Sequence, residues 1–152
     1  VVEVVLGNLY KENARMTTHF FARLTGKREI PPVNTEAYGV AEFIFSEDLK
    51  KLQYRVILKN IEKVTSCQIH LGKSDQIGPI VLSLLGPLKQ GISVNEGVVT
   101  GVVNVEEFEG PLQGRAFDSL LQEIIQANVY VNVYTKSNKK GEIRGRIRKV
   151  KK

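Results

Sequence analysis

The feature that most constrains the fold is the alternation of apolar and polar side chains along residues 51–59. The apolar set is Leu52, Tyr54, Val56 and Leu58, and the polar set between them includes Gln53, Arg55 and Lys59. Successive side chains of a β-strand point to opposite faces, so a period of two places one set in a core and the other in water. The segment therefore predicts a β-sheet with one wet face.

Further strand-like segments follow the same logic along the chain. They are residues 1–10, 17–25, 38–45, 64–71, 79–85, 97–105, 129–135 and 142–150. Turn-forming residues separate them: Pro31 and Pro32 require a loop over 27–34, and residues 60–63 are predicted to be a turn. About nine short strands at this spacing predict an all-β sandwich.

One stretch has helical periodicity instead. Its apolar residues recur at spacings of three and four: Phe117, Leu120, Leu121, Ile124 and Ile125. This pattern predicts one short amphipathic helix, with Asn128 as the left-handed residue that ends it.

Bulk properties exclude several classes of protein. The 152 residues fit one domain, and no apolar run approaches the ~20 residues of a membrane-spanning helix. The net charge of +6 is spread along the chain except for a basic tail over residues 144–152. Arginines at alternate positions there favour a half-exposed edge strand over a phosphate-binding patch, so no nucleic-acid partner is expected. Cys67 is the single cysteine, which excludes an internal disulfide and favours a buried, inert thiol.

Several phrases, in their order along the chain, resemble the CHRD (chordin-type) domain, which occurs in the developmental regulator chordin and in many microbial proteins. They are residues 20–33 (FFARLTGKREIPPV), 38–41, 52–56, 64–72 (VTSCQIHLG), 78–81, 130–135 (YVNVYT) and 141–147 (GEIRGRI). The resemblance covers about residues 19–148. It implies a Greek-key β-sandwich of the immunoglobulin or superoxide dismutase kind, an extracellular context and no enzymatic activity.

The family commonly carries a His-x-His pair in its central strand and a further histidine in its closing strand, reminiscent of copper–zinc superoxide dismutase. The matching positions here are Gln68, His70 and Tyr134. An amide and a phenol are poor replacements for imidazole ligands. We therefore expect a degenerate site with no metal, no cofactor and no catalytic residues.

The first 15 residues lie outside the resemblance and are expected to be an extension of a domain spanning 16–152. The apolar residues of this extension are Val1, Val2, Val4, Val5, Leu6, Leu9 and Tyr10. A strand of this composition can add to the open edge of a neighbouring sheet, as in an assembly protein. The first functional hypothesis is therefore a non-catalytic structural subunit of a cell-surface or extracellular structure, whose partner is another copy of itself or another surface protein.

Two alternatives remain at the level of sequence. In one, the chain is a monomeric extracellular module whose loops 27–37 and 73–78 recognise a protein or a glycan. In the other, it is a superoxide dismutase-like protein that has lost its ligands. No signal peptide is recognisable, so the sequence also leaves a cytoplasmic location open.

Overall fold

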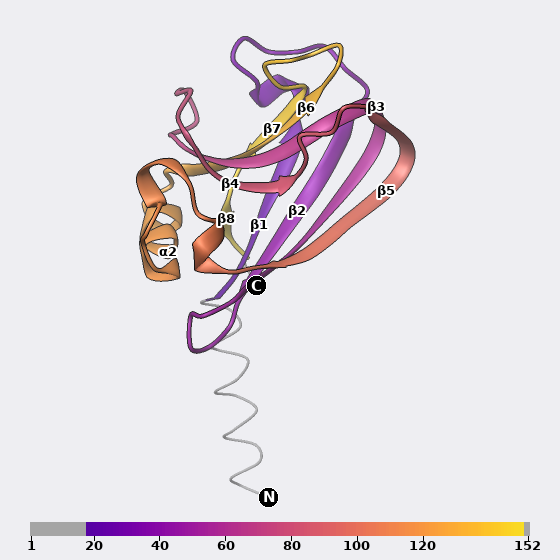
Figure 1. The fold of residues 1–152 in the computed structure, drawn as a ribbon. Coiled ribbons are helices and arrows are strands. Elements are labelled where there is room, and N and C mark those ends of the chain that lie inside the picture. The colour runs from indigo at the N-terminus through magenta and orange to yellow at the C-terminus, as the bar shows by residue number, and fades with distance from the viewer. Residues whose placement is uncertain (1–17, 151–152) are drawn as a thin grey trace, which may run out of the picture.

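The computed structural model describes residues 18–150 and folds them into a β-sandwich with one short α-helix (Figure 1). The strands are β1 (His19–Thr25), β2 (Tyr38–Phe45), β3 (Leu52–Leu71), β4 (Ile80–Leu85), β5 (Ile92–Val103), β6 (Val129–Thr135), β7 (Ile143–Arg146) and β8 (Arg148–Lys149). The helix α2 spans Phe117–Ile125. Three single-turn 3-10 helices are η1 (Gly26–Arg28), η2 (Val105–Glu107) and η3 (Gly110–Leu112).

The long strand β3 belongs to both layers of the sandwich. Its first half pairs with β2 and β5, and its second half pairs with β6 and β4. Val64 pairs with Ile92 of β5 and with Thr135 of β6, so β5 and β6 lie on opposite sides of β3. One layer is therefore ordered β1–β2–β3–β5 and the other β7–β6–β3–β4. Pairing of β1 with β7 and β8 joins the two layers along one side.

The core fills the space between these layers. Alternate residues of each strand face it, which is why the period-two segments of the sequence become its walls. The largest fully buried side chains in this core are Phe20, Phe43, Phe45, Phe117, Leu24, Leu52, Ile61, Ile69, Leu82, Leu120 and Ile143. Tyr54 bridges the layers on the side away from β1, because its hydroxyl donates to the Leu84 carbonyl oxygen at 2.7 Å.

The predicted helix is confirmed and lies at one end of the sandwich (Figure 1), with Phe117, Leu120 and Ile124 buried. Phe117 packs edge-to-face against Phe45, with ring centroids 6.0 Å apart. The residue that ends the helix in a left-handed conformation is Ala127, with φ of 60°, and the prediction of Asn128 for this role is wrong. Asn128 instead donates its side-chain amide to Glu123 Oε2 at 2.6 Å, which ties the strand that follows to the helix.

Residues 60–63, which were predicted to be a turn, lie inside β3. Asn60 and Lys63 adopt positive φ values of 53° and 54°, and the register with β5 shifts between Ile61 and Val64. The pairing with β5 is irregular at this point and resumes at Val64, and Ile61 stays 1% exposed in the core. The turn-forming residues 60–63 therefore produce a bend within β3 instead of ending it. The reason is that β5 pairs with β3 both before and after the bend, as far as Ile92.

Candidate functional site

His70 lies in a closed hydrogen-bond network. Its Nδ1 is 2.8 Å from the Gly78 carbonyl oxygen, and its Nε2 is 2.6 Å from the Tyr134 hydroxyl. A carbonyl can only accept, so Nδ1 carries the proton and Nε2 accepts from Tyr134. Burial lowers the pKa of His70 below its ordinary value, opposed by the bond to Gly78 and reinforced by Arg144. The imidazole is therefore neutral, and protein groups occupy both of its nitrogens.

The three ligand-like positions do not converge on one point. His70 and Tyr134 are bonded to each other, whereas the amide of Gln68 is 3.5 Å from the Ser83 hydroxyl on β4. Within residues 18–150, no group of three or more His, Cys, Asp or Glu side chains is placed to hold a metal ion.

A stack of three side chains continues from His70 across the outer face of the second layer. The Tyr130 ring lies parallel to His70 at a centroid distance of 4.9 Å, and the Arg144 guanidinium carbon lies 3.5 Å from the Tyr130 centroid on β6. Arg144 also donates to the carbonyl oxygens of Lys73 and Gln76, at 2.9 and 2.6 Å. Arg144 is only 3% exposed, and its two bonds to loop carbonyl oxygens hold the 72–78 loop against the sheet.

A second buried polar cluster surrounds Gly141. A Cβ atom built there would lie 2.5 Å from Asn132 Oδ1 and 2.7 Å from Glu29 Oε2, so the two oxygens approach the same point. Both oxygens are buried and have no hydrogen-bond partner among the described residues. Burial raises the pKa of Glu29 to about 7, against the lowering effect of Arg144 and with a further rise from Glu142. A protonated Glu29 can donate a hydrogen bond, whereas a carboxylate cannot. The Asn132 Oδ1 oxygen, which lacks a donor, can then accept that bond.

Glu142, next to this cluster, is held by neutral donors. Its carboxylate accepts from the hydroxyl groups of Thr35 and Thr135 at 2.7 and 2.8 Å, and from the Asn138 amide at 3.0 Å. These bonds connect the loop after η1 to the turn between β6 and β7. The bonds of Glu142 therefore join the two loops.

Cys67 is fully buried in β3, and desolvation raises the pKa of its thiol to about 12. The thiolate is the reactive form, so we expect no labelling of the folded protein by a thiol-specific disulfide reagent at pH 8. The same reagent should modify one thiol per chain in denaturant. Rapid labelling without denaturant would contradict the buried position.

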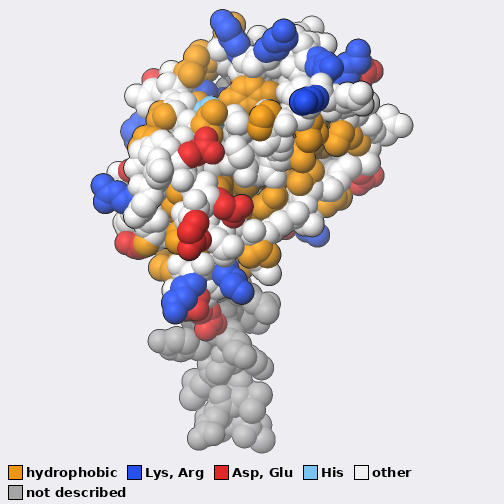
Figure 2. All heavy atoms as spheres, in the orientation of Figure 1, with side chains coloured by type: hydrophobic (Ala, Val, Ile, Leu, Met, Phe, Trp, Pro, Cys, Tyr) orange, Lys and Arg blue, Asp and Glu red, His pale blue; other side chains and the backbone are white. Residues whose placement is uncertain are grey.

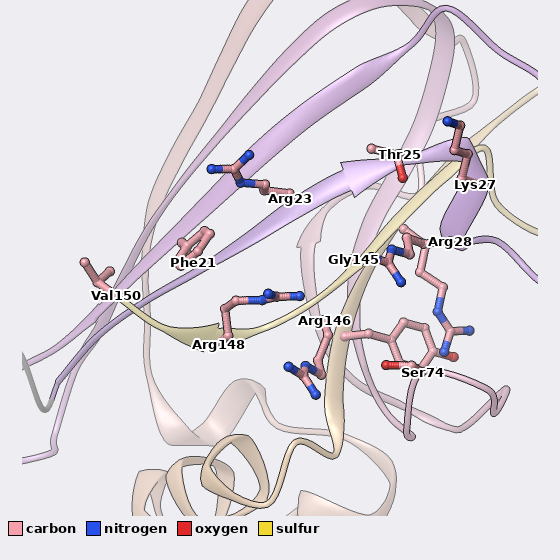
Figure 3. Close-up of a pocket in the computed structure, with 12 residues that line it drawn as sticks. Phe21, Arg23, Thr25, Lys27, Arg28, Ser74, Gly145, Arg146, Arg148 and Val150 are labelled. Atoms are coloured by element: carbon pink, nitrogen blue, oxygen red, sulfur yellow. The ribbon is translucent and has the colours of Figure 1, made fainter. Parts of the chain in front are cut away.

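A groove of about 970 Å³ lies on the outer face where β1 meets β7 and β8 (Figure 3). Its lining residues are Phe21, Arg23, Thr25, Lys27, Arg28, Ser74, Tyr130, Arg144, Gly145, Arg146, Arg148 and Val150. Six of these carry a positive charge and none carries a negative one. The basic side chains come from β1, from η1 and from the β7–β8 segment, so chain segments far apart in sequence build one cationic groove.

The basic tail is a solvated edge only at Arg148 and Lys149, which are exposed on β8, and the prediction is wrong for its first part. β7 lies between β1 and β6 and pairs with both, and Arg144 is buried. Sequence reasoning missed the groove because Arg23, Lys27 and Arg28 are about 120 positions away from the tail in the chain. The two predicted recognition loops, 27–37 and 73–78, both contribute lining residues to it.

The predicted assembly strand over residues 1–10 lies outside the described residues. The described chain does offer an edge to which a strand could add. β5 pairs only with β3, and along residues 18–150 no strand covers its other side. Its outward side chains Ile92, Val98 and Val102 are 49%, 57% and 52% exposed. Figure 2 shows hydrophobic side chains gathered on the side of the molecule along which β5 runs.

The layers, the bent central strand and the helix define a β-sandwich protein whose polar clusters bind its own loops together. A model of the CHRD domain matches residues 20–147, and the chain belongs to this family. CHRD domains are typically extracellular modules. Searches of curated proteins and of solved structures found no match. In the described part of the chain, no helix is long and apolar enough to cross a membrane.

Proposed function

We propose that this chain is a non-catalytic structural module of an extracellular or cell-surface assembly, and that copies join by adding a strand to β5. The open outer edge of β5 carries the proposal. The proposal includes the absence of catalysis, because the side chains most suited to catalysis are either hydrogen-bonded to other protein groups or fully buried. His70 uses both ring nitrogens in protein contacts, and Cys67 is a fully buried thiol.

The β5 edge lacks the usual protection against pairing. In natural proteins, lysine, proline, a bulge or a short length prevents an edge strand from pairing with another chain. β5 is 12 residues long, contains neither lysine nor proline, and has Glu96 as its one charged residue. The edge is therefore suited to backbone hydrogen bonding with an extended segment, and its exposed valines offer apolar contacts to alternate side chains of that segment.

The segment proposed to occupy this edge is residues 1–10 of a second copy. It contains seven apolar residues in ten and one charged residue, Glu3, so an extended form of it matches the chemistry of β5. A contact between the start of one chain and the β5 edge of another joins two different surfaces. Such heterologous contacts grow filaments unless they close into rings.

Light scattering after size-exclusion chromatography tests the proposal. The full chain should elute as oligomers or polymers, and a version beginning at Met16 should be monomeric. The variant Val98→Lys/Val102→Lys should also be monomeric, because lysine on an edge strand opposes strand addition. The control Tyr38→Lys/Ile44→Lys places the same charges on exposed positions of β2, which is paired on both sides, and should still assemble.

Two results would overturn the assembly role. A monomeric full chain would remove it and leave a monomeric binding module as the function. Oligomers that persist in the Val98→Lys/Val102→Lys variant would place the contact on another surface.

A further inference from the structure

The cationic groove gathers arginines from two neighbouring segments of the sheet, β1 and β7–β8. Phe21 pairs with Arg148, and Thr25 pairs with Arg144. Both pairs follow one antiparallel register, and continuing that register across the unpaired residues between them places Arg23 opposite Arg146. Like charges at opposed positions destabilise a sheet, so this register carries an electrostatic cost that the fold alone does not explain.

No carboxylate relieves that cost within the described chain. The ion pairs among residues 18–150 are Arg55 with Glu42 and Lys59 with Glu96, and neither involves a groove residue. Arg144 is occupied by two backbone carbonyls and by Tyr130. The remaining five cations, which are Arg23, Lys27, Arg28, Arg146 and Arg148, are exposed or half-buried, and no carboxylate among residues 18–150 forms an ion pair with them.

We propose that this groove binds a sulfated acidic polysaccharide. Alternate residues of one strand are about 7 Å apart, so Arg146 and Arg148 form a row of charges along the groove, with Arg23 across from them. A row of this kind fits a linear polyanion better than one isolated anion. The planar guanidinium binds two oxygens of a sulfate or carboxylate group at once, so arginine suits both anionic groups of such a chain.

The aromatic residues of the groove favour a saccharide over a single-stranded nucleic acid. Single-stranded nucleic acids gain much of their affinity by stacking bases on exposed aromatic rings. Tyr130 offers no free face, because His70 covers one side and Arg144 covers the other. Phe21 is the remaining aromatic ring, and it is half-buried. The groove therefore supplies charge without a row of stacking surfaces.

This inference is independent of the assembly proposed above. The groove is built by β1, η1, β7 and β8, whereas the assembly edge is β5, and the two share no residue. Either role can fail while the other holds.

Binding of a fluorescent heparin hexasaccharide to the full chain at physiological salt tests the groove. The variant Arg23→Ser/Arg146→Ser/Arg148→Ser should bind about tenfold or more weakly, and the slope of log affinity against log salt should fall by about two, because fewer counterions are released. The control Arg115→Ser/Lys139→Ser/Lys140→Ser removes the same charge from exposed positions outside the groove and should bind like the unaltered chain.

A second readout separates a binding role from a structural one. Because Arg23 and Arg146 repel each other, the groove variant should melt at a temperature no lower than that of the unaltered protein without ligand. Addition of heparin should raise the melting temperature of the unaltered chain more than that of the variant at the same heparin concentration.

Three outcomes would refute the proposal. They are equal binding by the groove variant and the unaltered chain, undiminished binding of chemically desulfated heparin, and tighter binding of a single-stranded oligonucleotide than of heparin. Equal binding by the groove variant would mean that heparin binds at another site. Undiminished binding of desulfated heparin would mean that sulfate is not the recognised group. Tighter binding of the oligonucleotide would mean that the ligand is a nucleic acid.

Discussion

Replacing Glu29 by Gln is expected to raise the free energy of unfolding at pH 8 by about 3 kcal/mol, because the folded protein raises this pKa from 4.5 to about 7. The buried carboxylate has to ionise at this pH in a site where Oε2 has no donor. A glutamine of the same shape carries no charge, and its amide can donate to the orphan Asn132 oxygen. The substitution therefore removes a desolvation cost and satisfies an acceptor.

The sign of the pH dependence follows from linkage. A carboxyl group whose pKa is higher in the folded protein holds its proton longer there than in the unfolded chain. Its contribution is most favourable below pH 4.5, declines as the pH rises from about 4.5 to 7, and remains at its lower value above that range. The difference in stability between the Glu29→Gln variant and the unaltered chain should therefore be small at pH 4 and reach its maximum above pH 7.

Urea unfolding followed by circular dichroism at several pH values measures this difference. Glu36→Gln is the matched control, since this carboxyl group is exposed a few residues further along the chain, and it should change stability little at any pH. A Glu29→Gln variant that lost the same stability at pH 4 and pH 8 would show that the side chain acts through shape rather than through its proton.

Gly145→Ala is expected to destabilise the protein by about 3 kcal/mol or more, since the added methyl group meets backbone atoms that cannot rotate away. Its Cβ would lie 1.9 Å from the Arg23 carbonyl oxygen and 2.7 Å from the carbonyl carbon. Relief of this overlap requires β1 and β7 to separate, and their contact is where the two layers of the sandwich join. Thermal and urea unfolding should both report the loss.

Gly114→Ala is the control for the general effect of replacing a glycine. Gly114 has a positive φ of 79°, but no other atom lies within 4 Å of the added Cβ. The backbone strain alone should cost about 1 kcal/mol. Equal losses in the two variants would mean that the approach of β1 to β7 is not the limiting contact.

Local patterns in the sequence were enough to predict most of the elements. The alternation over residues 52–59 and the three-and-four spacing from Phe117 to Ile125 each reflect the geometry of a few adjacent residues, and both are confirmed. The bend at Asn60 and Lys63 was predicted to be a turn because its support comes from β5, about 30 residues further on. The left-handed residue after the helix was predicted one position too late, at Asn128 instead of Ala127, because the apolar spacing does not fix the last residue of the helix.

The candidate sites divide in the same way. The replacement of histidine at Gln68 and Tyr134 is visible in the sequence, and so is the apolar character of residues 1–10. The unpaired edge of β5 is not visible, since a strand pattern does not say which neighbours it will have. The groove depends on the register between β1 and β7–β8, which brings Arg23 opposite Arg146.

The sequence by itself determined most of the described strand segments, most of the residues that face the core and which family the chain resembles. These properties depend on side-chain periodicity and on ordered motifs along the chain. Only the tertiary structure decided that Arg144 is buried under a loop, that Glu29 shares a site with Asn132, and that five free cations line one groove. Each of these depends on long-range strand pairing, whose register is set by the whole packed sandwich rather than by neighbours in sequence.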